Sequence, residues 1–254
     1  MIRIKNEKQI DGIRKSCKAL ARLYQALIPR VREGISTGEL DKFCVDFIKS
    51  IGGIPAWYSQ NFPGAACISV NDEVIHGIPS AKRIIKNGDF VSIDIGIDLG
   101  GYISDSAVTV PVGPVSPEKQ KLLSVTADCL KAGIEACRAG NRISDISRAV
   151  FDIADAAGFG VVHEYCGHGV GLKVHEDPQI PNVPSRGGPN PRIVPGMVLA
   201  IEPMINMGTG DVDLLDDDWT VVTADGSVSC HMEHTVAVFP DHTEVLTVLN
   251  PGEA

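Results

Sequence analysis

The 254-residue chain runs through the same order of helices, turns and strands twice. Residues 10–34 space their apolar side chains as an amphipathic helix does and end on glycine, and residues 116–140 do the same, with Ser116 as the N-cap. A second helical pattern follows in each half, opened by the capping box Ser36 to Glu39 in the first half and by Ser144 in the second. This repeat predicts two copies of one structural unit, related by a pseudo-two-fold axis.

The strand patterns repeat as well. One strand in each half reads glycine, four residues, isoleucine and a carboxylate, and the two carboxylates are Asp94 and Glu202. Further along each half a second strand pattern begins with an acid, which is Asp105 in one and Glu233 in the other. Each half therefore supplies two helices and then two strands that carry one acid each. The alternative is a chance resemblance between two generic α/β halves.

The repeat also predicts how the chain is organised in space. We expect one α+β domain over residues 1–254, with repeat halves of about 1–112 and 113–254. Strands of both halves would share one curved antiparallel sheet, and the helices would cover one of its faces.

Two of the acids belong to a predicted hairpin. Residues 90–99 alternate between apolar and polar or glycine, with Asp94 among the latter, and Gly100-Gly101 is a tight-turn signal. With a two-residue turn, strand parity puts Asp105 on the same face as Asp94. The two Cβ atoms would then lie about 5–8 Å apart, either directly opposite or diagonally.

Four acids at matched repeat positions favour a metal site. Two carboxylates this close repel each other, so one pKa would rise unless a cation lies between them. The repeat makes Glu202 and Glu233 the two-fold mates of Asp94 and Asp105. Any one acid alone is better interpreted as a surface charge or a helix cap, but the four together fit two divalent ions about 3.5–4 Å apart.

Histidines complete the predicted site. In Gly167-His168-Gly169 the glycines leave room for close approach to the imidazole, which makes His168 a candidate ligand. Oxygen ligands with one imidazole fit Mn, Fe, Co or Zn better than a thiolate zinc site. His76 and His175 remain open between catalytic and structural roles. The other four are interpreted as structural, although two of them flank Glu233: His163, His231, His234 and His242.

Charge and cysteine content exclude several classes of function. A net charge of −9 without any Lys/Arg-rich run argues against nucleic-acid binding and against docking on an anionic membrane. No apolar run is long enough to span a bilayer, and the N-terminus does not read as a signal peptide. Seven scattered cysteines are typical of reduced thiols. We therefore expect a cytoplasmic protein.

The same residues stand in an ordered set of motifs. Together they resemble the type I methionine aminopeptidases of bacterial type, in peptidase family M24, which have the creatinase-like pita-bread fold. The resemblance covers nearly the whole chain, and its specificity comes from the order and spacing of these stretches: Val70–Pro79, Ile93–Gly96, Gly101–Asp105, Cys166–Gly171, Ile201–Pro203 and Met232–Thr235.

The resemblance implies a role for each candidate residue. The five metal ligands would be Asp94, Asp105, His168, Glu202 and Glu233, with Asp105 and Glu233 bridging two divalent ions. Glu202 would also act as general base. His76 would contact the scissile nitrogen, and His175 would stabilise the carbonyl oxygen as it gains charge.

The resemblance also implies a substrate pocket. By alignment the methionine side chain would contact Phe62, Cys67 and Trp219, with Ser59 and Val174 nearby. Family members often carry aromatic residues at the last two positions, so the smaller side chains here change the expected pocket shape. A plain core role for Phe62 and Trp219 is the alternative.

The implied function is a metalloprotease that removes the initiator methionine during protein maturation and prefers a small second residue. Its partners would be the N-termini of nascent polypeptides, met at the ribosome, and it would be a monomer. Asn71 and Ser229 match positions that hold a monovalent cation in some relatives. A proline-specific peptidase, a non-catalytic binding protein of the same fold and an unrelated metal-binding fold are the rival interpretations.

Overall fold

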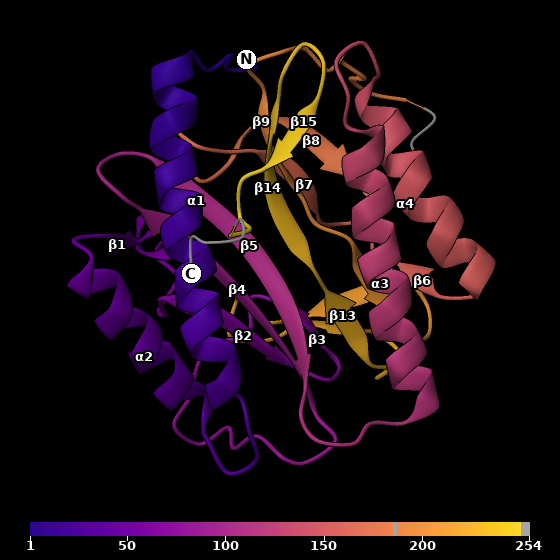
Figure 1. Ribbon diagram of the computed structural model, residues 1–254. Helices are drawn as coiled ribbons and strands as arrows, with labels where there is room; N and C mark the ends of the chain where they lie inside the picture. The colour runs from indigo at the N-terminus through magenta and orange to yellow at the C-terminus, as the bar shows by residue number, and fades with distance from the viewer. Residues whose placement is uncertain (185–186, 250–254) are drawn as a thin grey trace.

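A computed structural model describes residues 1–184 and 187–249 (Figure 1). In those ranges no helix is both long and apolar enough to cross a membrane. The helices found there are α1 (Glu7–Leu27), α2 (Thr37–Ser50), α3 (Pro117–Ala136) and α4 (Ile143–Ala157), with the short 3₁₀ turns η1 (Ile28–Arg30) and η2 (Ala56–Gln60).

The first two helices begin where the sequence places polar caps. Asn6 caps α1, and the amide N–H of Gln9 donates to its side-chain oxygen over 3.0 Å. Ser36 caps α2 as predicted, because it accepts from the Glu39 amide at 3.2 Å while the Glu39 carboxylate accepts from the Ser36 amide at 2.9 Å. This reciprocal pairing satisfies backbone donors that a helix N-terminus leaves without partners.

The second pair of helices confirms one predicted cap and corrects the other. Ser116 caps α3, with Pro117 as the first helical residue. Helix α4, however, begins at Ile143 and not at Ser144. The Asp145 carboxylate accepts from the Arg142 amide at 2.8 Å, and the side-chain oxygen of Asn190 accepts from the Ser144 amide at 3.0 Å. A side chain from a distant segment thus satisfies a first-turn donor that a polar cap would otherwise serve.

Strands from both halves form one large sheet. Along its main path the order is β1-β4-β5-β14-β9-β7-β8, while β2 pairs with β4 and β15 pairs with β14. Two smaller sheets have the orders β13-β10-β6 and β11-β12-β3. The strand bounds are β1 (Ile54–Pro55), β2 (Ala66–Val70), β3 (Glu73–Ile75), β4 (Phe90–Asp98), β5 (Ile103–Pro111), β6 (Gly160–Val161), β7 (Cys166–Gly169), β8 (Glu176–Pro181), β9 (Val198–Ile201), β10 (Met204–Asn206), β11 (Val212–Leu214), β12 (Val221–Thr223), β13 (Ser229–His231), β14 (Glu233–Val238) and β15 (Thr243–Val245).

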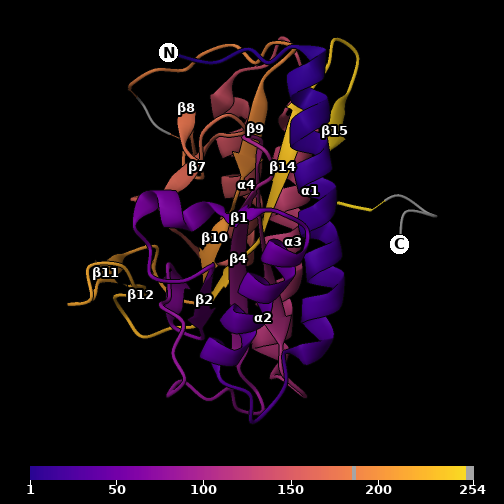
Figure 2. The ribbon, with the colours of Figure 1, turned by 90° about the vertical axis from the view of Figure 1, so that its left-hand side faces the viewer.

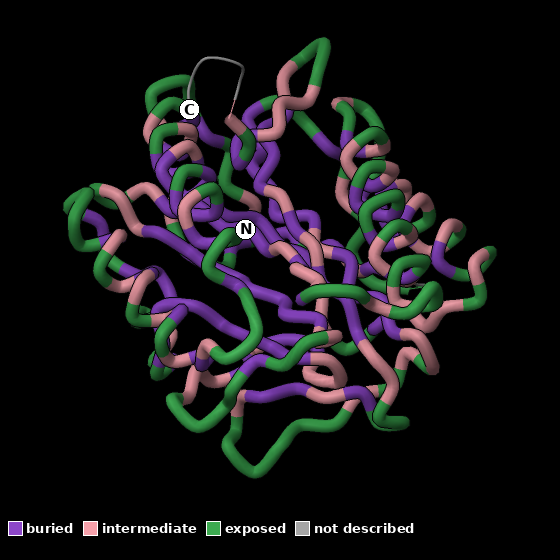
Figure 3. Tube along the Cα trace, turned by 60° about the horizontal axis from the view of Figure 1, so that its bottom comes forward, coloured by how far each residue is buried: buried purple, intermediate pink, exposed green. Residues whose placement is uncertain are grey.

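The helices lie on one side of the large sheet. Helix α1 packs on β4 and β5, and α3 packs on β9 and β14. Figure 2 shows α1 and α3 on one side of the strands, with the β11–β12 arm on the other. In Figure 3 the strands run as buried chain between helices whose outer turns are exposed. Apolar clusters fill the layer between helices and sheet in each half separately. The predicted α+β architecture is therefore confirmed.

The repeat is visible in backbone hydrogen bonds. The N–H of Gly34 donates to the carbonyl of Ile85, and the N–H of Gly140 donates to that of Ile193, both over 2.9 Å. The φ angles of the two glycines are +86° and +96°, in the left-handed region that glycine adopts without strain. Both halves thus turn in the same way between their two helices. The boundary near residue 112 stays a prediction.

Candidate metal centre

The first two acids lie on the β4–β5 hairpin. Its turn residues, Gly100 and Gly101, have φ angles of +65° and +85°, as a two-residue turn that follows the strand twist requires. In the ladder Gly96 pairs with Asp105, two residues along β4 from Asp94. The carboxylates therefore share one face, as parity predicts, and stand diagonally.

The other two acids face each other across β9 and β14. His234 pairs with Ile201, and Glu233 and Glu202 are the next residues along their strands. The two halves meet where β14 pairs with β5, because Glu233 pairs with Ala107. Ala107 is also the partner of Asp94 in β4. All four acids therefore lie on one face of four adjacent strands.

This face of the sheet is shielded from water. Asp94, Asp105 and Glu233 are buried, and the Glu202 side chain keeps 12% of its surface exposed. Three buried carboxylate oxygens have no hydrogen-bond partner among the residues that the structure describes: Asp94 Oδ1, Asp105 Oδ1 and Glu233 Oε1. A buried acceptor without a partner is costly, so these oxygens need a cation or a proton.

In the metal-free protein burial disfavours the ionised form of these acids. It raises the pKa of Asp94 to about 8. The pKa values of Asp105, Glu202 and Glu233 are raised well above the ordinary range, first by burial and then by the charges of neighbouring acids. Divalent cations between the acids would remove this conflict, because they favour the ionised form of every carboxylate.

His168 points a ring nitrogen at the acids from β7. Its Nε2 lies 3.5 Å from Glu202 Oε1 and 3.7 Å from Asp105 Oδ2, while Nδ1 lies 3.0 Å from the carbonyl oxygen of Gly169. Burial lowers the pKa of His168 to about 3, so the ring is neutral at pH 7. If Nδ1 carries the proton, Nε2 presents a lone pair to carboxylate oxygens, an arrangement that a bound cation explains.

The glycines on either side of His168 allow close backbone approach. A Cβ on Gly167 would lie 2.4 Å from the carbonyl oxygen of Ala200, and one on Gly169 would lie 2.3 Å from that of Asp177. The interpretation of the G-H-G sequence is therefore confirmed for the backbone. Donor atoms of Asp105, His168 and Glu233 all lie within 4.8 Å of one another, as a metal ligand set requires.

The two further histidines flank this centre. His76 has a φ of +58°, a strained conformation outside glycine that often marks functional positions. Burial lowers its pKa to about 4, and its ring centroid lies 5.9 Å from that of Tyr165. The His175 ring meets that of His168 edge-on, with centroids 4.4 Å apart, and burial lowers its pKa too.

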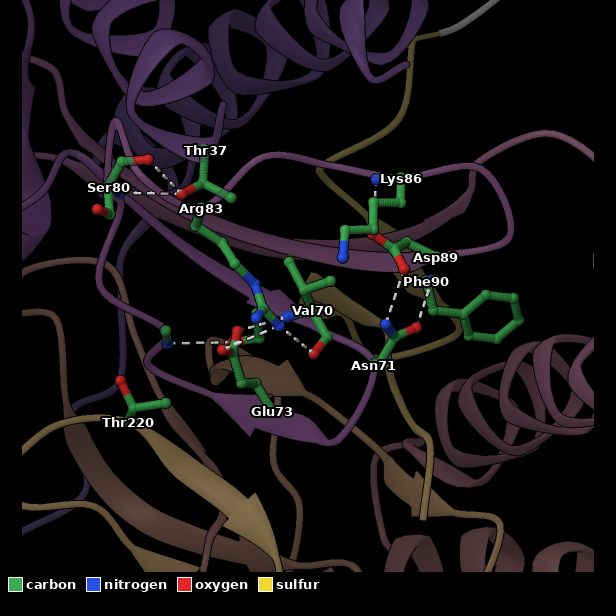
Figure 4. A network of polar contacts seen from close by, with 12 residues as sticks. Thr37, Val70, Asn71, Glu73, Ser80, Arg83, Lys86, Asp89, Phe90 and Thr220 are labelled. Carbon is green, nitrogen blue, oxygen red and sulfur yellow. Dashed lines mark hydrogen bonds and ion pairs between the residues drawn. The ribbon is translucent and has the colours of Figure 1, made fainter. Parts of the chain in front are cut away.

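The turn that leads into His76 is held by a polar network. The Glu73 carboxylate accepts from the Val70 amide at 2.7 Å and pairs with Arg83 at 3.3 Å. Figure 4 shows the Arg83 guanidinium reaching across to Glu73 and the Val70 carbonyl. These contacts join β2, β3 and the segment that follows His76, so the strained residue sits in a fixed frame.

Figure 4 also shows the surroundings of Asn71, one of the two predicted monovalent-cation residues. The Asn71 side chain bonds to Asp89 at 2.9 Å and to the Phe90 amide at 3.0 Å. Lys119 Nζ lies 3.1 Å from its side-chain oxygen. The Ser229 amide donates to the Asn71 carbonyl at 2.8 Å, so the predicted pair is adjacent, while the cation itself stays a prediction.

A cavity of about 470 Å³ opens over the acids. It brings together all five predicted ligands with both flanking histidines: Asp94, Asp105, His168, Glu202, Glu233, His76 and His175. Sequence reasoning did not single out Trp57, Tyr165 or Cys166, which also line it. Trp57 is tied to the site by its indole N–H, which donates to the Asp94 carbonyl at 3.2 Å.

His231 is the other residue whose place the sequence only hinted at. Its buried Nε2 lies 3.8 Å from Glu202 Oε2 and has no hydrogen-bond partner within the described ranges 1–184 and 187–249. Burial lowers its pKa to about 3. It lies two residues before Glu233, and this proximity in sequence was the available signal. His168 and His231 therefore approach different oxygens of the Glu202 carboxylate.

Two residues of the predicted methionine pocket, Phe62 and Trp219, lie close to His76 or to each other. The Trp219 ring lies 5.2 Å from that of Phe62, edge-on, and 6.2 Å from that of His76. Cys67 pairs with Asp94 across β2 and β4, and it shares one apolar cluster with Phe62 and Val174. Phe62, Cys67 and Trp219 do not line the 470 Å³ cavity itself. Ser59, by contrast, donates its hydroxyl to the Ala56 carbonyl at 2.8 Å.

The fold and the site together define a metallopeptidase. A model described as metallopeptidase family M24 matches residues 11–240, and the chain belongs to this family. The donor set fits that class, because the residues that face one another are carboxylates and a neutral imidazole. The predicted family is thereby confirmed.

Within the family the chain groups with the methionine aminopeptidases. It is 66% identical to a methionine aminopeptidase of Treponema pallidum (strain Nichols), over 97% of this chain and 96% of that protein. It is 46% identical to methionine aminopeptidase 1 of Bacillus subtilis (strain 168), over 97% and 99%. The solved methionine aminopeptidase of Thermotoga maritima superposes with a TM-score of 0.94 at 36% identity, covering 98% of this chain and 100% of that one.

More distant structures share only the fold. The prolidase of Pyrococcus furiosus has a TM-score of 0.75 at 23% identity, and the match covers 97% of this chain and 66% of that one. The pita-bread fold predicted from the sequence is therefore confirmed by methionine aminopeptidases and prolidases alike.

Proposed function

We propose that this chain is a methionyl aminopeptidase that hydrolyses the peptide bond after the first methionine of a polypeptide, with two divalent metal ions bound to its four acids and His168. The observation that carries the proposal is the cluster of buried carboxylates whose oxygens face one another without partners. The high identity to methionine aminopeptidases over the full length supports the reaction.

The ligand assignment follows from the position of each acid. Asp105 and Glu233 come from the central, adjacent strands β5 and β14 and are the natural bridging residues. Asp94 lies on the first-half side of them, and Glu202 and His168 lie on the second-half side. Mn, Fe, Co and Zn all accept such a donor set, so we propose a divalent ion without choosing among them.

When bound, such ions polarise the scissile carbonyl and lower the pKa of water towards neutrality. The chain's own residues do the rest. Glu202 faces the cavity and is the least buried of the four acids. We therefore assign it the role of general base, which accepts a proton from the attacking water and then donates it to the departing nitrogen. Both histidines have lowered pKa values, so they act as neutral hydrogen-bonding groups.

The two histidines take different parts of the substrate. We assign His76 to the scissile nitrogen and His175 to the carbonyl oxygen, where an N–H donor stabilises the negative charge that develops. The 4.4 Å between the ring centroids of His175 and His168 supports this assignment, because His168 itself lies against the acids. His76 approaches from the first half of the chain, against Tyr165 and Trp219.

Substrate selection follows from the surroundings of the site. The apolar cluster of Phe62, Cys67 and Trp219 offers aromatic and sulfur surface to a flexible thioether side chain. Val174 is buried in the same cluster and narrows it less than an aromatic side chain would. We propose a small second residue and nascent polypeptides as physiological substrates, encountered by a monomeric, cytoplasmic enzyme at the ribosome.

The test is direct. The protein is stripped with chelator, and Mn, Co, Fe or Zn is added back separately. Peptides that begin with Met-Ala, acetyl-Met-Ala and Ala-Pro are then offered, and products are read by mass spectrometry. We expect metal-dependent loss of one methionine from the free Met-Ala peptide only. Cleavage of Ala-Pro would instead indicate a proline-specific peptidase, and folded protein inactive with every metal would contradict the proposal.

A further inference from the structure

A buried ion pair joins the N-terminal segment to the end of the His175 loop, which is the stretch of residues 170–175 between β7 and β8. Lys5 Nζ lies 2.8 Å from Glu176 Oε2, and each side chain keeps only 1% of its surface exposed. The two residues are 171 positions apart in sequence. Removing two charges from water is costly, so a pair this deep persists only where its geometry is fully satisfied.

Glu176 is satisfied by the loop that it closes. Its second oxygen, Oε1, accepts the amide of Leu172 at 2.8 Å and that of Lys173 at 2.9 Å. Through these two hydrogen bonds the Glu176 carboxylate closes the loop that contains His175. The ammonium of Lys5 occupies the remaining oxygen, which otherwise would be a buried acceptor without a partner.

The N-terminal segment is itself held in place. The Lys5 amide donates to the carbonyl of Gly196 at 2.8 Å, just ahead of β9. A Cβ on Gly196 would lie 2.8 Å from the Lys5 carbonyl oxygen, so the two backbones are in contact. A Cβ on Gly171 would likewise lie 3.6 Å from the Lys5 side chain. Lys5 thus reaches the loop from a fixed base.

We propose that Lys5 is a positioning residue for catalysis, which holds His175 at the reacting carbonyl by fixing Glu176. The inference rests on the proposed function, since His175 acts there on the carbonyl oxygen. His175 is bonded through the chain to Glu176, and its ring has to stay within contact distance of His168 to serve that role. A small displacement of a catalytic donor lowers the rate strongly, because its interaction is tuned to the transition state.

The first variant is Lys5→Met, which keeps the length of the side chain and removes its charge. We expect kcat to fall by roughly tenfold while KM changes by less than about twofold, because the lost interaction is with the transition state. Lys5→Arg, which keeps the charge, should recover part of the loss. If Lys5→Met folds poorly, the double variant Lys5→Met/Glu176→Gln replaces it. This variant removes both buried charges and keeps a side-chain oxygen that can accept from the amides of Leu172 and Lys173.

The matched control is Arg14→Met. Arg14 also ties an N-terminal element to a distant strand, through two bonds of 2.9 and 2.8 Å to Glu244, but it does not touch the His175 loop. We expect this variant to keep wild-type kcat at any temperature well below its unfolding midpoint. Equal losses of kcat in Arg14→Met and Lys5→Met would reduce the Lys5 effect to general stability and overturn the proposal.

Two measurements decide the matter. In a His175→Ala background, Lys5→Met should lower kcat by less than about twofold, because residues that act as a unit are not additive. Hydrogen exchange at the Leu172 and Lys173 amides should accelerate in Lys5→Met and not in Arg14→Met. An undiminished kcat loss in the His175→Ala background, or unchanged exchange, would contradict the proposal. Hydrogen exchange needs no turnover, so it tests separately whether Lys5 holds the loop. A wild-type enzyme without activity would count against the proposed function, and the exchange rates would still show whether Lys5 fixes residues 172–173.

Discussion

The two halves of the molecule place their acids by the same plan but with different registers. In the first half Asp94 and Asp105 stand diagonally on one continuous hairpin. In the second half Glu202 and Glu233 stand across from each other on strands that a long segment separates. The registers differ by two residues, which preserves the face of every side chain, whereas a shift of one would turn the acids away. Strand parity, and not an identical register, is therefore what the repeat conserves.

The halves differ more in the chemistry around their acids. His168 pairs with Ala200 in β9, and the matching position of the first half, opposite Ser92, is Ser69. At this position the second half has an imidazole that approaches the acids, and the first half has the Ser69 hydroxyl, which accepts from the Gly77 amide at 3.1 Å. His175 and His231 also belong to the second half, so the proton chemistry that we propose gathers around Glu202.

Removing His168 or Glu202 tests the difference between the halves most strongly. His168→Ala or Glu202→Ala should abolish turnover, with kcat at least about a thousandfold lower, while the chain stays folded. The reason is that we assign these side chains to metal binding and proton transfer, and they belong to none of the apolar clusters. Steady-state kinetics at saturating metal, with circular dichroism as the control for folding, gives the answer. Full activity of either variant would refute the role of that residue.

A smaller effect compares the flanking histidines of the two halves. His76→Ala and His175→Ala should each lower kcat by roughly a hundredfold while metal content stays at the wild-type level, because each removes one hydrogen-bonding group from the transition state. Kinetics combined with elemental analysis of dialysed protein separates loss of chemistry from loss of metal. Metal depletion in either variant would make that histidine a ligand and contradict the assignment.

The proposed methionine pocket takes Phe62 and Cys67 from the first half and Trp219 from the second, and its loss should show in KM. Trp219→Ala is expected to raise KM for a Met-Ala peptide about tenfold and to change kcat little, because the ring adds apolar contact before and during reaction alike. Leu215→Ala, at an exposed apolar position on the same arm, is the matched control and should leave KM unchanged. An unchanged KM in Trp219→Ala would leave Trp219 with a core role only.

The smallest effect is a pH dependence of the metal-free protein. Asp94 has a folded pKa of about 8, far above its unfolded value near 4, so at neutral pH the folded state binds more protons than the unfolded state. Stability must then fall as pH rises through the folded pKa. The buried histidines have lowered folded pKa values and oppose this only below about pH 6.5.

Between pH 7 and 8 the free energy of unfolding of the metal-free protein should therefore fall by about 1 kcal/mol for Asp94 alone. Denaturant titrations at both pH values measure it. Saturating divalent metal should remove the decline, because the acids are then ionised on both sides of the window. A metal-free protein equally stable at both values would contradict the buried, protonated acids.

Much of this account follows from local sequence signals. The Ser36–Glu39 cap, the Gly100-Gly101 turn and the shared face of Asp94 and Asp105 depend on neighbours in sequence, and the structure confirms them. The family motifs then pointed to the remaining candidate residues. The predicted start of α4 is wrong by one residue because Asn190, which is distant in sequence, accepts from the Ser144 amide in place of a polar cap side chain.

What the sequence did not reveal depends on contacts between distant segments. Parity could not decide whether the acids stand diagonally or across, since both keep the same face. The approach of His231 to Glu202 depends on the pairing of β13 with β10, where His231 lies opposite Met204, and the Lys5–Glu176 pair joins residues 171 positions apart. No periodicity or spacing encodes such pairs.

The central claim is that both halves together hold two divalent ions. Anomalous diffraction from crystals grown with Mn tests it most directly, because scattering locates each ion without reference to activity. We expect two peaks about 3.5–4 Å apart, between the acids of the first half and those of the second, with His168 beside one of them. A single peak held by the acids of one half, or none at full Mn saturation, would contradict it.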